Sequence, residues 1–266
     1  MEAKLYQIFY DNESKSRLLP EFTPYDKSHR GYDGWHEYSV IRDILLDRGR
    51  VFSDEEYIGF FSPRFYEKVS LTGEQVCQIV SSSSSDVISF SPDFWQTAIF
   101  QNSFYQGETY HSGLLECAQK ICEELNLSID LKAIWQDRHR IIFSNYFVAK
   151  YRIWKQWLEL SEAVFAMAQN PASRLFSDLN QPVRHRNYDN KHLMAVFIVE
   201  RLISVLLERN SIDAQVAINF PKDDSRLANF LILDAIKSAV IKSDLPEHRA
   251  LFFRYREHLF PNHKFQ

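Results

Sequence analysis

The chain has 266 residues, 45% of them hydrophobic and 25% charged, which is the ordinary balance for a globular protein with a sizeable core. Its net charge of -4 argues against a general nucleic-acid-binding protein, because such proteins usually present a strongly basic face. Only 7 glycines occur, and neither a P-loop nor a dinucleotide-binding Gly-x-Gly-x-x-Gly pattern is present. The 3 cysteines fit reduced thiols, so we expect a cytoplasmic protein without a membrane span.

The first half of the chain predicts strands that end in polar residues. Residues 4–10 read as a strand that runs into Asp11 and Asn12, and residues 14–34 read as a loop over the site. Residues 35–46 read as an amphipathic helix. The apolar run 58–61 reads as a buried strand, and it must end at Ser62-Pro63 because proline cannot donate to a sheet ladder. Arg64 then follows at the strand exit, where ligands bind in open α/β sheets.

The middle of the chain alternates between patterns typical of helices and patterns typical of strands. Thr72 and Gln75 form the pattern of a capping box at a helix start, and residues 86–90 read as another strand. Residues 94–126 are mostly helical, with His111 near a turn. Residues 141–149 read as a strand interrupted by Ser144-Asn145, and a long amphipathic helix follows around Trp154.

The last third begins with the polar residues 170–191, which include Arg184 and Arg186 and which we expect to form a loop ordered by a ligand. Residues 193–207 read as one buried helix that is apolar except for Glu200, Arg201 and Ser204. Ser204 lies one turn after Glu200 and shares its face, which suggests a polar recess that opens on a cavity. A strand at residues 212–220 and a long helix to about residue 241 follow.

Alternating strands and helices predict an α/β fold with a mostly parallel central sheet flanked by helices. We expect one α/β domain over residues 1–245 and a tail over residues 246–266. In this tail aromatic residues such as Phe252 and Phe253 interleave with arginines. That pattern suits docking on an anionic membrane surface or a partner, and it equally suits aromatic packing on the domain.

Four segments occur in an order that resembles a known family. They are Trp35-His36-Glu37, Glu56-Tyr57-Ile58-Gly59-Phe60, Ser144-Asn145-Tyr146-Phe147-Val148 and Phe197-Ile198-Val199-Glu200-Arg201-Leu202. Over roughly residues 1–210 this resembles bacterial capsular and exopolysaccharide glycosyltransferases, whose patterns run Tyr-Val-Gly-Leu-Cys-His-Tyr-Arg-Arg-Tyr-Phe, Asn-Met-Phe and Phe-Leu-Ala-Glu-Arg-Leu. The chain departs from the first pattern at residues 60–65, which hold a single arginine, Arg64.

The resemblance implies an enzyme with a single GT-A-like (Rossmann-like) domain. Such an enzyme transfers a sugar from a nucleotide-sugar donor to a glycan or lipid-linked glycan acceptor. Such an enzyme works in the cytoplasm, and it can contact the inner face of the membrane or assembly machinery peripherally. Many GT-A enzymes bind a divalent metal through an Asp-x-Asp motif. Here the matching positions are Ser62 and Arg64, so we expect no metal and a charge role for the arginine.

The resemblance and the chemistry together assign candidate roles. For catalysis they name Glu200, then Asp137, as the base and Arg64 as the cation that stabilises the leaving diphosphate. Donor-binding candidates are Asp11, Asn12, Ser62, Arg64, Asn145, Arg184 and Arg186. Acceptor-binding candidates are His111, Glu200 and Ser204.

Each candidate also has a structural interpretation. Glu200 and Arg201 can form a buried ion pair, His111 can be a hydrogen-bonded core histidine, and Asn145 can serve backbone groups at a bulge. Arg184 and Asp137 can lie on solvated loops, as Arg64 can on a turn. A non-catalytic nucleotide- or glycan-binding scaffold subunit is therefore the alternative to the enzyme.

Overall fold

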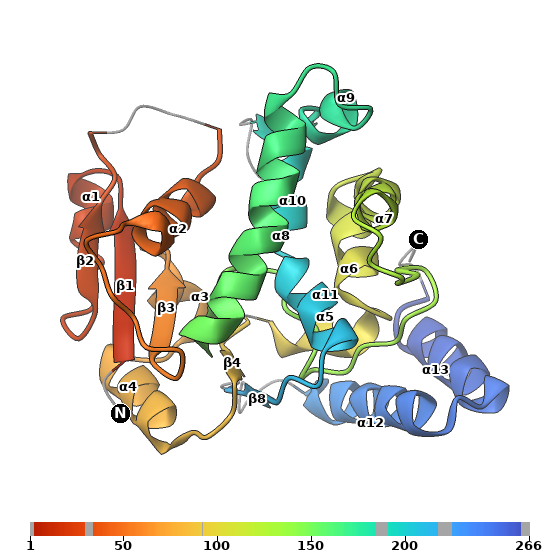
Figure 1. Cartoon of the computed structure of the whole chain (residues 1–266). Coiled ribbons are helices and arrows are strands. Elements are labelled where there is room, and N and C mark those ends of the chain that lie inside the picture. The colour runs from red at the N-terminus through yellow and green to blue at the C-terminus, as the bar shows by residue number, and fades with distance from the viewer. Residues whose placement is uncertain (1–2, 30–33, 92, 185–190, 218–224, 262–266) are drawn as a thin grey trace.

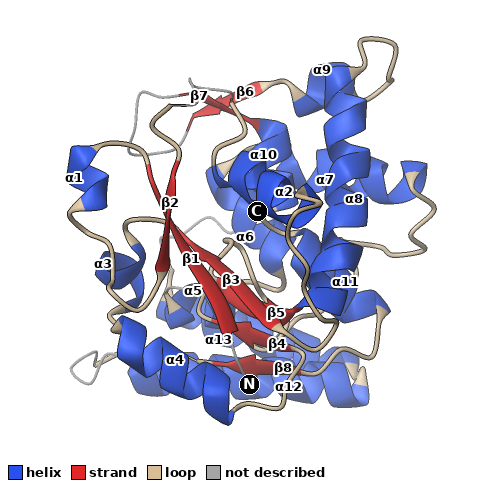
Figure 2. Cartoon of the chain, turned by 60° about the vertical axis from the view of Figure 1, so that its left-hand side comes forward, coloured by secondary structure: helices blue, strands red, loops and turns tan. Residues whose placement is uncertain are grey.

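The computed structural model describes residues 3–29, 34–91, 93–184, 191–217 and 225–261. Its main sheet has six strands in the order β2-β1-β3-β5-β4-β8, drawn in Figure 2. Their bounds are β1 Ala3–Phe9, β2 Thr23–Asp26, β3 Tyr57–Phe61, β4 Val87–Ser89, β5 Phe147–Lys150 and β8 Ala214–Val216. The short strands β6 Pro182–Arg184 and β7 Lys191–Leu193 form a separate antiparallel pair.

The main sheet is mostly parallel, as the sequence predicts. β1 pairs in parallel with both β2 and β3, and β4 pairs in parallel with β8. β5 runs antiparallel to its two neighbours, β3 and β4. The carboxyl ends of β1, β2, β3, β4 and β8 therefore meet at one edge of the sheet.

Helices cover the two faces of the sheet unequally (Figure 1). Alternate strand residues such as Ile58 and Phe60 pack under α2 Glu37–Leu46, α7 Leu114–Glu124, α8 Tyr151–Gln169, α10 Met194–Val199 and α11 Leu202–Arg209. The intervening residues, such as Tyr57 and Phe61, pack against the smaller layer of α3 Phe65–Val69 and α4 Gly73–Ser82. This division follows from the alternation of side chains along a strand.

The remaining helices are α1 Asn12–Lys15, α5 Phe94–Ile99, α6 Ser103–Tyr110, α9 Phe176–Leu179, α12 Leu227–Ser243 and α13 Pro246–Leu259. The predicted capping box at the start of α4 is confirmed: Thr72 Oγ1 accepts from the Gln75 amide at 3.2 Å, and Gln75 Oε1 accepts from the Thr72 amide at 2.9 Å. None of the helices in the described ranges is both long and apolar enough to cross a bilayer.

The predicted helix over residues 193–207 is interrupted at Glu200 and Arg201, between α10 and α11. In a continuous helix the Phe197 carbonyl would accept from the Arg201 amide. Here that carbonyl accepts from the Arg201 guanidinium at 2.6 Å, and the Arg201 amide bonds to Ile198 O at 2.9 Å instead. The side chain thus competes with its own backbone for this carbonyl, and the break separates Glu200 from α11, which carries Ser204.

Other differences from the expectations are local. The strand expected over residues 141–149 begins only at Phe147, and the loop expected over residues 14–34 contains the edge strand β2. The tail forms α13 and packs on α12 and α5. Its Phe252 is fully buried and lies 5.2 Å from the ring of Trp135, so the structure shows the packing alternative for this aromatic side chain.

Candidate functional site

A pocket of about 300 Å³ opens at the carboxyl ends of β1 and β3. Two short helices contribute lining residues, Glu13 and Ser14 from α1 and Lys68 from α3. Figure 2 shows α1 after β1 and α3 after β3. Apart from Pro63 its lining residues are polar, and they include three cations, Arg17, Arg64 and Lys68, and three carboxylates, Asp11, Glu13 and Glu37. Because cations gathered at the exit of parallel strands suit an anionic ligand, we take this pocket as the candidate site.

Asp11 lines the pocket and also caps α1. Its Oδ1 accepts from the Ser14 amide at 2.7 Å, while the Ser14 hydroxyl accepts from the Asp11 amide at 3.0 Å. The hydrogen bond from the Ser14 amide lowers the pKa of Asp11, so this carboxylate stays charged. Asn12 is exposed in the first turn of α1 beside it.

Ser62 is buried at the base of the pocket. Its hydroxyl shares a hydrogen bond with the Tyr146 hydroxyl, and its carbonyl accepts from Gln7 Nε2 at 3.2 Å. Tyr146 follows Asn145 directly, so the loop before β5 is tied to the end of β3. The Ser62 side chain therefore joins two strand ends as well as lining the pocket.

Arg64 and Arg17 lie on the rim and share Glu67 as an acidic partner, and Arg17 also pairs with Glu13, which lines the pocket. Arg64 Nε is 3.0 Å from Glu67 Oε2, and Arg17 Nη1 is 3.2 Å from Glu67 Oε1. The side chains of Arg17, Arg64 and Glu67 are more than a third exposed. Exposed ion pairs of this kind contribute at most about 1 kcal/mol, so an anionic ligand can displace Glu67 from either arginine.

Lys68, which sequence reasoning missed, lies one helical turn after Arg64 in α3. Its Nζ lies 5.4 Å from the ring centre of Tyr146. Burial of this ammonium group opposes its charge, but attraction to Tyr146, Glu200 and Glu37 outweighs burial and raises the pKa of Lys68. The signal for this residue was the four-residue spacing from Arg64, which puts both side chains on one side of a helix.

Glu200 sits at the break between α10 and α11, with 23% of its side chain exposed. Burial raises the pKa of its carboxyl group to about 7, the charges of Arg201 and Lys68 lower it, and that of Glu37 raises it. Arg201 is a distant partner, with Nη1 at 3.8 Å from Oε2. Glu200 therefore titrates near neutral pH in the company of two residues of the pocket.

Glu37 connects the pocket to the first residue of α2. Its Oε1 accepts a hydrogen bond from the Tyr10 hydroxyl at 2.9 Å, and both residues line the pocket. The sequence placed Glu37 in a segment of the resemblance without a role. The structure groups its charge with those of Glu200 and Lys68.

Arg201 is buried and satisfied by neutral acceptors rather than by Glu200. It donates to Ser103 O at 3.0 Å, to Phe197 O at 2.6 Å and to Gln106 Oε1 at 2.6 Å. A cation held in this way fixes the chain beside Glu200 without neutralising its carboxylate in a close pair. The buried ion pair considered for these two residues is thus a loose one.

Ser204 and Asp137 are not among the residues that line the pocket. The Ser204 hydroxyl accepts from the Ile142 amide at 2.9 Å and lies 2.8 Å from Arg140 O, so it supports the loop before β5. Asp137 Oδ1 accepts from the His139 amide at 3.0 Å. The charge of Asp137 acts on the pKa of Lys237, a residue of α12.

His111 and Asn145 are not among the residues that line the pocket, and they come from two other segments. The buried His111 ring stacks on Phe197, three residues before Glu200, with ring centres 3.6 Å apart. Asn145 is 7% exposed, and its Oδ1 makes no hydrogen bond within the described part of the chain. The backbone of Arg184 belongs to β6, while Arg186 falls outside the described residues.

Within the described ranges, no three His, Cys, Asp or Glu side chains gather as the ligands of a metal ion do. Comparison of the chain with models of protein families, with curated proteins and with solved structures gives no match. The geometry and charge of this pocket, together with the resemblance in the sequence, are therefore the basis for a function.

Proposed function

We propose that the protein is a glycosyltransferase that moves a sugar from a nucleotide-sugar donor to a glycan or lipid-linked glycan acceptor in bacterial surface polysaccharide synthesis. The observation that carries the proposal is that a pocket lined by three cations lies close enough to Glu200 for two of its charges to act on that carboxyl group. Arg17, Arg64 and Lys68 line the pocket, and Glu200, with a pKa of about 7, is coupled to two of the pocket's charges. The three cations are suited to binding a diphosphate, and the Glu200 carboxylate is suited to accepting a proton.

In the proposed reaction the acceptor hydroxyl lies against Glu200 and the donor diphosphate lies between the cations. As the acceptor oxygen bonds to the anomeric carbon, its proton passes to the Glu200 carboxylate. The bond from that carbon to the diphosphate breaks, and its electron pair leaves with the nucleoside diphosphate. Fixed positive charge at the leaving group lowers the barrier, because the charge is greatest in the transition state and product. This single displacement inverts the anomeric configuration.

In this proposal the cations of the pocket bind the donor diphosphate without a metal ion. Arg64 occupies a position where carboxylates hold a metal in many GT-A enzymes, and a guanidinium can bind a diphosphate oxygen pair in bidentate fashion. Lys68, four residues later, adds a point charge. The proposed site is cytoplasmic, and a lipid-linked acceptor would bring the protein to the inner face of the membrane. Nucleic acid has no part in the proposal.

The alternative is a scaffold subunit that binds a nucleotide or glycan without turnover. It is favoured by the partners that the pocket side chains already have, such as Glu67 for both arginines and Tyr146 for Ser62. Glu67 pairs with both arginines when no ligand is bound, so the pocket is stable without a substrate, as a scaffold subunit requires.

The test is nucleoside diphosphate release from a panel of nucleotide sugars, with calorimetric titration of the free nucleoside diphosphates. The enzyme is expected to bind a diphosphate and to release it from one donor in the presence of acceptor. A chelator should leave this release nearly unchanged. Binding without release would favour the scaffold, no binding of any nucleotide would overturn both versions, and activity restored only by a divalent cation would overturn the metal-independent role.

A further inference from the structure

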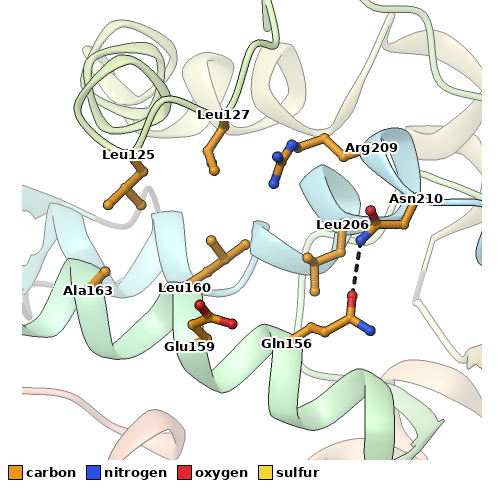
Figure 3. A pocket seen from close by; sticks show the side chains of 9 residues that line it. All are labelled: Leu125, Leu127, Gln156, Glu159, Leu160, Ala163, Leu206, Arg209 and Asn210. Carbon is orange, nitrogen blue, oxygen red and sulfur yellow. Dashed lines mark hydrogen bonds between the residues drawn. The ribbon is translucent and has the colours of Figure 1, made fainter.

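A second pocket, of about 270 Å³, lies away from the sheet edge, among α8, the end of α11 and the segment after α7 (Figure 3). Helix α8 contributes Gln156, Glu159, Leu160 and Ala163, and the end of α11 contributes Leu206, Arg209 and Asn210. None of these residues lines the pocket at the ends of β1 and β3. The proposed transfer reaction therefore makes no use of it.

The interior of this pocket is apolar. Leu127 and Leu206 are buried at its base, and Leu125, Leu160 and Ala163 are half-buried around them. The leucines come from three separate segments and converge on one space in Figure 3. A hollow of this kind favours an aliphatic group, because removing apolar surface from water is favourable on both partners.

Two side chains of opposite charge stand at the mouth of the pocket. Arg209 comes from α11 and Glu159 comes from α8, and Figure 3 shows them on different sides of the leucines. Neither makes a hydrogen bond or an ion pair within the described part of the chain. Their neighbours do: Lys155 pairs with Asp54 at 2.6 Å and Arg140 with Glu208 at 3.2 Å.

The amides close one end of the pocket. Asn210 Nδ2 donates to Gln156 Oε1 at 3.0 Å, which joins α8 to the end of α11. The two charged side chains remain separated across the mouth. A ligand with a carboxylate and an ammonium group complements both, whereas a simple carboxylic acid leaves Glu159 facing another negative charge.

The size of the pocket narrows the ligand further. A volume of 270 Å³ corresponds to about nine water molecules at roughly 30 Å³ each, which is below the range of most drug-sized ligands. We infer that this pocket binds a free aliphatic amino acid of about the size of leucine. Its side chain lies among the leucines, its carboxylate on Arg209 and its ammonium group against Glu159.

The inference is tested by calorimetric titration of the full chain with three probes of similar shape. They are leucine, 4-methylpentanoate, which lacks the ammonium group, and 3-methylbutylamine, which lacks the carboxylate. Leucine should bind saturably and about tenfold more tightly than either analogue, the scale of one hydrogen bond to a charged group. Equal binding of all three would show purely apolar recognition and overturn the inference, as would the absence of leucine binding at millimolar concentration.

Two substitutions assign the charges. Arg209→Gln should weaken the binding of leucine about tenfold and leave the binding of 3-methylbutylamine unchanged. Glu159→Gln should weaken the binding of leucine but not that of 4-methylpentanoate. Both side chains are exposed, so both variants should fold. Lys155→Gln, on the same helix outside the pocket, is the matched control. Leucine binding unaffected by either pocket substitution would place the ligand elsewhere. The experiment needs no turnover, so its outcome is independent of the proposed transferase activity.

Discussion

Glu200 is the residue whose charge depends most directly on the interrupted helix. Arg201 is already bonded to three neutral oxygens, and its Nη1 lies 3.8 Å from Glu200 Oε2, so it forms no close pair with this carboxyl group. Burial consequently dominates and raises the pKa of Glu200. A carboxylate poised near neutral pH is suited to proton transfer, and it destabilises the folded chain when it is charged.

Replacing Glu200 separates these two effects. Its pKa of about 7 in the folded chain exceeds the ordinary 4.5, so the proton it holds stabilises folding at low pH. That stabilisation is lost as the pH rises from about 5 through about 7. Glu200→Gln should therefore gain stability relative to the parent between about pH 5 and pH 8, and it should lose transfer by roughly 10² to 10⁴.

The measurements are melting temperature across that pH range and turnover on the same preparation. Arg209→Gln is a control of the same helix pair that should leave transfer unchanged. A Glu200→Gln variant that is less stable at every pH, with normal turnover of its folded fraction, would assign Glu200 to structure.

Glu67 is the acidic partner that the two rim arginines, Arg17 and Arg64, share. It is 3.0 Å from Arg64 and 3.2 Å from Arg17, so its charge competes with an anionic ligand for both. Glu67→Gln should tighten binding of a nucleoside diphosphate a few-fold, the scale of an exposed ion pair, whereas Arg64→Ala should lower transfer by about 10² or more.

Calorimetry with nucleoside diphosphate measures the first effect, and Glu74→Gln on α4 is the control, because it changes the same net charge outside the pocket. Weaker binding in Glu67→Gln would mean that Glu67 positions the arginines for the ligand rather than competing with it.

At the scale of elements, the sequence predicted the features that depend on neighbouring residues better than those that depend on residues far apart in the chain. β1 and β3 followed from apolar runs ended by polar residues or proline, and α4 from its capping box, because these depend on neighbours in sequence. The same strand-exit reasoning brought Asp11, Ser62 and Arg64 to one pocket. The helix break at Arg201 could not be predicted in this way, since it requires partners on α6. Lys68 was missed because the sequence showed only a turn after Arg64.

Lys237 attaches the last two helices to the rest of the fold. It is fully buried in α12, and its ammonium group donates to Thr97 O, to Phe100 O at 2.9 Å and to Gln136 O at 2.9 Å. Lys237→Ala would leave three buried carbonyl oxygens without this donor. We expect it to lower the free energy of unfolding by about 2–4 kcal/mol.

Denaturant unfolding of Lys237→Ala and of Lys242→Ala measures this effect, since Lys242 is an exposed lysine on the same helix. Equal stability of the two variants would show that apolar packing alone holds α12 in place.

At the scale of the whole molecule, residues from the middle and the end of the chain share one apolar cluster. Phe94 and Phe100 around α5 pack with Phe230 of α12 and Phe252 of α13. Helix α13 thus packs on the fold through this cluster. A peripheral contact with a membrane or with assembly machinery remains a proposal, and the buried aromatic ring of Phe252 is not its contact surface.

Two adjacent residues of α13 decide between packing and membrane insertion. Phe252 is fully buried, while Leu251 beside it is 49% exposed. If α13 serves folding, Phe252→Ala should lower the free energy of unfolding by about 3–5 kcal/mol, and Leu251→Ala should stay within about 0.5 kcal/mol of the parent. Sedimentation with anionic vesicles supplies the second readout. Insertion of this helix would make Leu251→Ala the variant that loses vesicle binding while keeping its stability, because only an exposed apolar side chain can enter the lipid without unfolding the cluster.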